Sequence, residues 1–135
     1  MTCQICYNIF MKTVLIIDDN KDVADIYSIK LKAAGFNVFS FSDSEEGLFQ
    51  AEKLKPDLIL LDVVMPKLSG PDFFLKLKEN SRTQNIKVLF LTAYNDPSPW
   101  GQVADKQYSL KIGAQGFLRK ESPLDEVVTE IKKII

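Results

Sequence analysis

Three short apolar segments of the sequence end abruptly at side chains that can do chemistry, and a lysine follows a fourth. The polar residues at these ends are Asp18 and Asp19, Asp62, Thr92 and Lys120. Carboxylates held close together repel one another unless a hard divalent cation lies between them, and oxygen ligands with open positions for water suit Mg²⁺. A lysine and a threonine beside them would bind phosphoryl oxygens, which leaves the middle carboxylate free to act as a nucleophile. The set indicates transfer of a phosphoryl group to an aspartate.

Most of these residues also have a simpler explanation when each is taken alone. Asp18 and Asp19 would equally cap a helix that begins beside them, because acids favour helix N-termini. Thr92 would be an ordinary strand-ending residue and Lys120 a surface lysine. Asp62 differs, because it interrupts a long apolar stretch in which a charge is costly without partners. We therefore favour the functional interpretation for the set as a whole.

The composition excludes several other kinds of chemistry. The 135 residues contain no histidine, which excludes a Ser-His-Asp or Cys-His catalytic arrangement, a histidine-ligated metal and a phosphohistidine on this chain. The 17 basic and 18 acidic residues give a net charge of −1, so no positive field exists to hold a nucleic acid or an anionic membrane. We expect no direct nucleic-acid partner.

The first ten residues contain the only two cysteines, Cys3 and Cys6, as one C-x-x-C pair. No second pair and no histidine complete a zinc site, so we interpret them as reduced thiols of a cytoplasmic protein. This segment lacks the features of a signal peptide, and the apolar runs of the chain are too short to span a bilayer. The sequence predicts a cytoplasmic location and no membrane insertion.

The apolar segments themselves predict the elements that must position the polar residues. Uncharged apolar runs of this length are typical of strands buried on both faces of a parallel sheet. The predicted strands are 14–17, 38–41, 58–61, 88–91 and 117–118. Helical spacing of apolar residues, with Asn20 as an N-cap and Gly35 as a stop for the first helix, predicts helices at 21–34, 42–54, 73–80, 102–112 and 124–135.

Five strands that alternate with five helices predict an α/β fold. Right-handed crossovers would give a doubly wound five-stranded parallel sheet with helices on both faces. In such a sheet the ligand site lies at the carboxyl ends of the strands, where the strand order reverses. This rule selects the same aspartates, threonine and lysine. We predict one domain over residues 12–135, preceded by a short N-terminal extension over residues 1–11.

Four motifs, in this order, resemble those of the response-regulator receiver domains of two-component signalling. The segments that carry the resemblance are VLIIDDN (14–20), LILLDVVMPKLSG (58–70), VLFLTAY (88–94) and GAQGFLRK (113–120). Each segment is weakly specific alone, whereas four in the right order are strongly specific. The resemblance covers roughly residues 12–135 and implies the flavodoxin-like fold of a receiver.

The resemblance also implies a role for each site residue. The groups implied to hold Mg²⁺ are Asp18, Asp19, Asp62 and the backbone carbonyl of Val64. Asp62 would be the phosphoacceptor, and Thr92 and Lys120 would contact the phosphoryl group. Thr92 and Phe117 would act as switch residues that pass the change on.

Two features depart from the family pattern. The family usually places a proline directly after the lysine, whereas Glu121 and Ser122 here precede Pro123, so the turn that aims Lys120 is altered. The stretch between the threonine and the lysine is also longer than usual, with the extra residues around Asn95 to Gly101. We therefore expect an atypical signalling surface near this loop.

The resemblance implies a signalling phosphoacceptor and not an enzyme. Since the chain has no histidine, a histidine kinase or a histidine phosphotransfer protein would phosphorylate Asp62 in trans. No sequence follows the last predicted helix, so we expect a stand-alone receiver. Its output would be a changed surface for a downstream protein target, on the fourth helix, the fifth strand and the fifth helix.

Two alternatives remain open. The first is a small phosphohydrolase that uses an aspartyl-phosphate. Enzymes that resemble the haloacid dehalogenase family carry D-x-D at the nucleophile, whereas Asp62-Val63-Val64 has an apolar residue in the second acidic position, which argues against repeated turnover. The second is a phosphorylation-independent pseudo-receiver that serves as an interaction module, an alternative that the altered turn after Lys120 keeps open.

Overall fold

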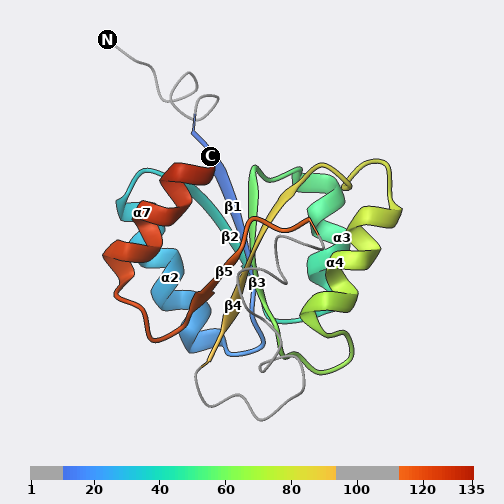
Figure 1. The fold of residues 1–135 in the computed structure, drawn as a ribbon, viewed down its shortest axis with the longest axis horizontal. Coiled ribbons are helices and arrows are strands. Elements are labelled where there is room, and N and C mark those ends of the chain that lie inside the picture. The colour runs from blue at the N-terminus through green and yellow to red at the C-terminus, as the bar shows by residue number, and fades with distance from the viewer. Residues whose placement is uncertain (1–10, 94–112) are drawn as a thin grey trace.

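The computed structural model describes residues 11–93 and 113–135 of the chain. Five strands in this part form one sheet between two layers of helices (Figure 1). The strands are β1 (Thr13–Ile17), β2 (Asn37–Phe41), β3 (Leu58–Asp62), β4 (Lys87–Thr92) and β5 (Phe117–Arg119). All neighbouring strands are parallel, in the order β2-β1-β3-β4-β5. The predicted doubly wound sheet is confirmed.

Two described helices cover each face of the sheet. Helices α2 (Lys21–Ala33) and α7 (Leu124–Ile134) lie on one face, and α3 (Ser44–Leu54) and α4 (Gly70–Glu79) lie on the other (Figure 1). Side chains alternate along a strand. Leu15 therefore packs in the core under α3 and α4, while its neighbour Ile16 packs in the core under α2 and α7. Because both faces are covered, the three inner strands β1, β3 and β4 contain continuous apolar runs, at 14–17, 58–61 and 88–91.

Helix α2 begins at Lys21, as the sequence indicated, and ends at Ala33, one residue before the predicted end. The Asn20 side chain accepts hydrogen bonds from the backbone N–H groups of Asp22 and Val23, as an N-cap does. After the helix the chain turns at Gly35, whose φ of +100° lies in the region that favours glycine.

Two other helices begin at residues that differ from the prediction. Helix α3 begins at Ser44 rather than at residue 42, because the Asp43 side chain caps it by accepting from the backbone N–H groups of Glu45 and Glu46. Helix α4 begins at Gly70 rather than at residue 73. Pro71 lies in its first turn, where a missing N–H group costs no helical hydrogen bond.

Several predictions concern residues outside the described part of the chain. These are the helix at 102–112, the loop around Asn95 to Gly101, and the cysteine pair. The structure therefore describes four of the five predicted helices. No helix in residues 11–93 and 113–135 is both long enough and apolar enough to cross a membrane.

Candidate functional site

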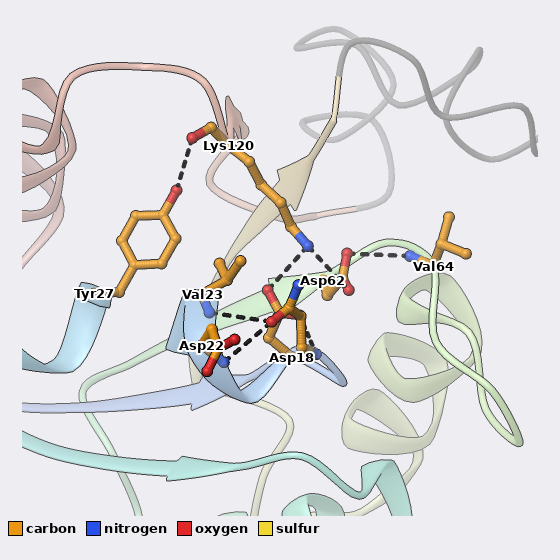
Figure 2. A network of polar contacts seen from close by, with 8 residues as sticks. Asp18, Asp22, Val23, Tyr27, Asp62, Val64 and Lys120 are labelled. Carbon is orange, nitrogen blue, oxygen red and sulfur yellow. Dashed lines mark hydrogen bonds and ion pairs between the residues drawn. The ribbon is translucent and has the colours of Figure 1, made fainter. Parts of the chain in front are cut away.

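The carboxyl ends of four neighbouring strands bring the predicted site residues to one edge of the sheet. Asp18 follows β1, Asp62 ends β3, Thr92 ends β4 and Lys120 follows β5. Figure 2 shows the side chains of Asp18, Asp62 and Lys120 facing one another. The strands β1 and β3 are adjacent, but the chain leaves them toward opposite faces through α2 and α4. The residues thus lie at the switch point of the sheet, where such folds bind ligands.

Three carboxylates form the acidic part of the site. One carboxylate oxygen from each of Asp18, Asp19 and Asp62 lies within 4.8 Å of the others. Asp18 is fully buried and Asp62 is 5% exposed, whereas Asp19 faces solvent. Oxygen ligands beside an exposed edge suit Mg²⁺, which keeps several of its waters. The donor set therefore fits a hard divalent cation.

The helix-capping explanation for the two acids does not hold. Asn20 is the residue that caps α2, with its Oδ1 3.0 Å from the Asp22 nitrogen and 3.3 Å from the Val23 nitrogen. Asp18 instead accepts a hydrogen bond from the Asn20 N–H through Oδ1, at 2.9 Å. Its second oxygen, Oδ2, faces Lys120 in the interior of the site.

Lys120 makes ion pairs with both buried carboxylates. Its Nζ lies 3.0 Å from Asp18 Oδ2 and 3.3 Å from Asp62 Oδ2 (Figure 2). Its backbone N–H donates to the carbonyl oxygen of Thr92 at 2.8 Å, which joins the lysine to the end of β4. One ammonium facing two carboxylates leaves an excess negative charge in a buried place.

The excess of negative charge shifts the pKa of both Asp62 and Lys120. The pKa of Asp62 is raised from 3.8 to about 8. Burial is the largest cause of the rise and the charge of Asp18 adds to it, while the Lys120 ammonium acts against both. Burial acts to lower the pKa of Lys120, but the charges of Asp62 and Asp18 outweigh it and the pKa is raised. A carboxylate at Asp62 is therefore costly until a further positive charge joins the site.

The two residues expected to act as switches have different surroundings. Thr92 is 1% exposed, and its Oγ1 has no hydrogen-bond partner among the described residues. A buried hydroxyl without a partner is uncommon and costs stability. Phe117 is half-buried, packs against the core under α3 and α4, and has the Arg119 guanidinium 5.5 Å from its ring centre. Its switch role stays a prediction.

The loop between β3 and α4 is held close to Asp62. The Val64 N–H donates to Asp62 Oδ1 at 3.4 Å, and Val64 itself is 41% exposed (Figure 2). The Gly70 N–H donates to the Val63 carbonyl at 2.8 Å. A Cβ atom at Gly70 would lie 2.4 Å from the Asp62 carbonyl oxygen, so only glycine allows this approach. The sequence places Gly70 at the end of a receiver-like motif but gives no signal of this close approach.

Two further contacts near the site had no signal in the sequence. Lys67, in the same loop, has a φ of +67°, and its Nζ lies 2.9 Å from Asp43 Oδ2, which connects the loop to the start of α3. The Tyr27 hydroxyl on α2 donates to the backbone carbonyl of Lys120 at 3.4 Å (Figure 2). Tyr27 is 3% exposed and lies within the helix predicted over 21–34, but helical spacing does not reveal the partner of a hydroxyl.

The strand order and the acidic site at its switch point define a flavodoxin-like α/β protein. The family model described as the response regulator receiver domain matches residues 14–132, which is nearly the whole chain. The chain belongs to the response-regulator receiver family, as its four motifs indicated.

The curated relatives include transcriptional regulators of about twice this length. The chain is 35% identical over 125 residues to the DNA-binding dual master transcriptional regulator RpaA of Synechocystis sp., covering 93% of this chain and 49% of that protein. It is 33% identical over 124 residues to the alkaline phosphatase synthesis transcriptional regulatory protein PhoP of Bacillus subtilis, covering 92% and 48%. The chain thus spans about half the length of these relatives.

Solved structures of similar length share the fold. The chemotaxis protein CheY4 of Vibrio cholerae superposes with a TM-score of 0.78 at 28% identity, covering 93% of this chain and 99% of that one. A response regulator receiver domain protein of Clostridium thermocellum gives a TM-score of 0.79 at 28% identity, covering 93% and 94%. Members of this family are signalling proteins and not enzymes, which sets aside the phosphohydrolase alternative.

Proposed function

We propose that this chain is the phosphoacceptor of a two-component phosphorelay and that Asp62 receives the phosphoryl group. The observation that carries the proposal is the nearly buried Asp62 carboxylate at the switch point, facing both the Asp18 carboxylate and the Lys120 ammonium. A buried cluster of charges contributes little to stability. The buried Thr92 hydroxyl at the end of the adjacent strand, which has no hydrogen-bond partner within residues 11–93 and 113–135, also supports a site built for a ligand.

Three side chains of this chain have defined roles in the transfer step. An oxygen of the Asp62 carboxylate attacks the phosphorus of a phosphohistidine, the new P–O bond forms as the P–N bond breaks, and the leaving imidazole nitrogen takes up a proton from solvent. Lys120 balances the charge of the phosphoryl oxygens, and the Thr92 hydroxyl donates a hydrogen bond to one of them. The product is an acyl phosphate on Asp62.

The donor histidine lies outside these 135 residues, which contain none. A histidine kinase or a histidine phosphotransfer protein is the partner that this chemistry requires. Mg²⁺ is the cofactor, and Asp18, Asp19, Asp62 and the backbone carbonyl of Val64 would hold it. When bound, it supplies positive charge to the carboxylates and to the phosphoryl oxygens.

The output of the phosphorelay is a changed protein surface recognised by a downstream protein in the cytoplasm. Phosphorylation shifts the balance between two conformations that already exist, by drawing Thr92 toward the phosphoryl group and moving Phe117 with it. The net charge of −1 supports a protein target over direct contact with nucleic acid.

The experiment that tests the proposal is incubation with Mg²⁺ and acetyl phosphate, a small phosphoryl donor, followed by measurement of the intact mass. Wild-type protein is expected to gain one phosphate, and removal of Mg²⁺ by a chelator is expected to prevent the gain. Asp62→Asn should gain none. The matched control is Asp25→Asn, which removes an exposed carboxylate from α2 and should be phosphorylated like the wild type. Equal labelling of folded Asp62→Asn, or no labelling of the wild type, would contradict the proposal.

A further inference from the structure

The turn that carries Lys120 is held from two sides. Within the turn, the Ser122 N–H donates to the Arg119 carbonyl at 3.0 Å. The Lys120 N–H donates to the Thr92 carbonyl of β4 at 2.8 Å, and the Lys120 carbonyl accepts from the Tyr27 hydroxyl of α2 at 3.4 Å (Figure 2). The backbone of Lys120 is thus connected to β4 on one side and to α2 on the other.

Tyr27 is a rigid donor for this second contact. Its ring belongs to the core under α2 and α7, together with Leu31, Val127 and Ile131, and is 3% exposed. Packing on all sides fixes the place of the hydroxyl, and a buried tyrosine hydroxyl requires a hydrogen-bond partner. Burial also raises the pKa of Tyr27, so the phenol keeps the proton that it donates.

The position of the Lys120 backbone determines where its ammonium lies. The side chain is long and flexible, yet its Nζ is within ion-pair distance of two carboxylates at the ends of different strands. A small displacement of a group that contacts the reacting atoms is enough to weaken its action. No proline directly follows Lys120 to restrain the turn, because Pro123 comes three positions later, so the restraint must come from contacts with the rest of the fold.

We propose that Tyr27 is a positioning residue, whose hydroxyl holds the Lys120 carbonyl so that the ammonium is aimed at the phosphoryl group on Asp62. This inference rests on the proposed function. Tyr27, in the core under α2, would supply the restraint on Lys120 that the altered turn lacks.

The test is the variant Tyr27→Phe, which keeps the ring and removes the hydroxyl. The probe is beryllofluoride, a phosphoryl analogue, titrated at saturating Mg²⁺. The affinity for beryllofluoride should fall about fivefold, which converts to about 1 kcal/mol. The affinity for Mg²⁺ alone should stay within about twofold, because the backbone of Asp18, Asp19 and Asp62 is positioned by β1 and β3 and not by the turn. The matched control is Ser28→Ala, which removes from the same helix a hydroxyl without a partner among the described residues, and should change neither affinity.

Combining Tyr27→Phe with a substitution of Lys120 shows whether the Tyr27 hydroxyl acts through the lysine or only supports the fold. Lys120→Met removes the ammonium, so Tyr27→Phe in that background should cause no further loss of beryllofluoride affinity. An equal loss in both backgrounds, or no loss in the single variant, would overturn the role of Tyr27 and leave the proposed function standing. A wild-type protein that binds no beryllofluoride would overturn the proposed function and this inference with it.

Discussion

Replacing Asp62 with asparagine should stabilise the protein in the absence of magnesium. The folded protein holds the carboxylates of Asp18 and Asp62 against a single ammonium, that of Lys120, in a nearly buried place. Asparagine keeps the size of the side chain and removes one negative charge. The ion pair between Asp18 and Lys120 then remains with balanced charge.

The pKa of Asp62 sets an upper limit on the effect. The pKa rises from 3.8 to about 8 on folding, and each pKa unit corresponds to about 1.4 kcal/mol. The cost of ionising Asp62 in the folded protein is therefore at most about 6 kcal/mol. Entry of water and adjustment of Lys120 raise the effective dielectric constant, so we expect the variant to gain about 2 kcal/mol in the free energy of unfolding at pH 8.

The gain should depend on pH in a defined direction. Between pH 3.8 and about 8 the Asp62 carboxyl binds more protons in the folded than in the unfolded protein. The free energy of unfolding of the wild type therefore falls as pH rises through this range, relative to a variant that cannot ionise at this position. The advantage of Asp62→Asn should be absent near pH 4 and complete above about pH 8.

Urea unfolding with a chelator present, at pH 5 and at pH 8.5, measures this difference. The control Asp25→Asn removes an exposed carboxylate and should match the wild type at both pH values. Saturating Mg²⁺ should make the wild type more stable than Asp62→Asn, because only the wild type keeps all three carboxylates and is stabilised by the full binding energy of Mg²⁺. If Asp62→Asn were less stable than the wild type at pH 8.5 without Mg²⁺, the inferred charge imbalance would be wrong.

Three further substitutions test separate parts of the site. Asp19→Asn should weaken Mg²⁺ binding by at least about tenfold, measured by calorimetric titration, and should slow phosphorylation, measured by intact mass. If neither value changed, Asp19 would be an ordinary surface residue and not a metal ligand. Thr92→Val should raise the free energy of unfolding by about 1 kcal/mol, because it removes a buried hydroxyl that has no partner in the described part of the chain. The same substitution should lower the affinity for beryllofluoride at least about tenfold. A fall in stability would show that the hydroxyl has a structural partner. Gly70→Ala should lower the free energy of unfolding by about 2 kcal/mol and also weaken Mg²⁺ binding, because its Cβ meets the Asp62 carbonyl. The control Gly47→Ala places a Cβ against the Ile17 side chain and should lower stability without changing Mg²⁺ affinity.

The strands and the site residues were predictable from the sequence because one physical rule links them. A strand covered on both faces must be apolar throughout, so the first polar residue after such a run marks the edge of the sheet. Asp62 illustrates this, since it ends a strand in which every residue is buried. Parallel strands meet at the same edge, and the ends of four strands therefore predicted the neighbours of Asp62.

Contacts between elements that are distant in sequence could not be predicted in the same way. Tyr27 and Lys120 are 93 positions apart, and the spacing that places Tyr27 in a core says nothing of where its hydroxyl points. The approach of Gly70 to the Asp62 carbonyl depends on the path of the intervening loop. The start of α3 was misplaced by two residues because Ser42 and Asp43 are both suitable N-caps, and only the structure shows that Asp43 accepts the hydrogen bonds.

The most direct test of the proposed function is to locate the phosphoryl group after reaction with acetyl phosphate and Mg²⁺. Borohydride reduces an aspartyl phosphate to homoserine, which marks the modified residue for peptide mass spectrometry. The proposal predicts homoserine at position 62 and at no other aspartate of the chain. Homoserine at Asp18 or Asp19 in place of position 62, or none in a folded protein that binds Mg²⁺, would contradict it.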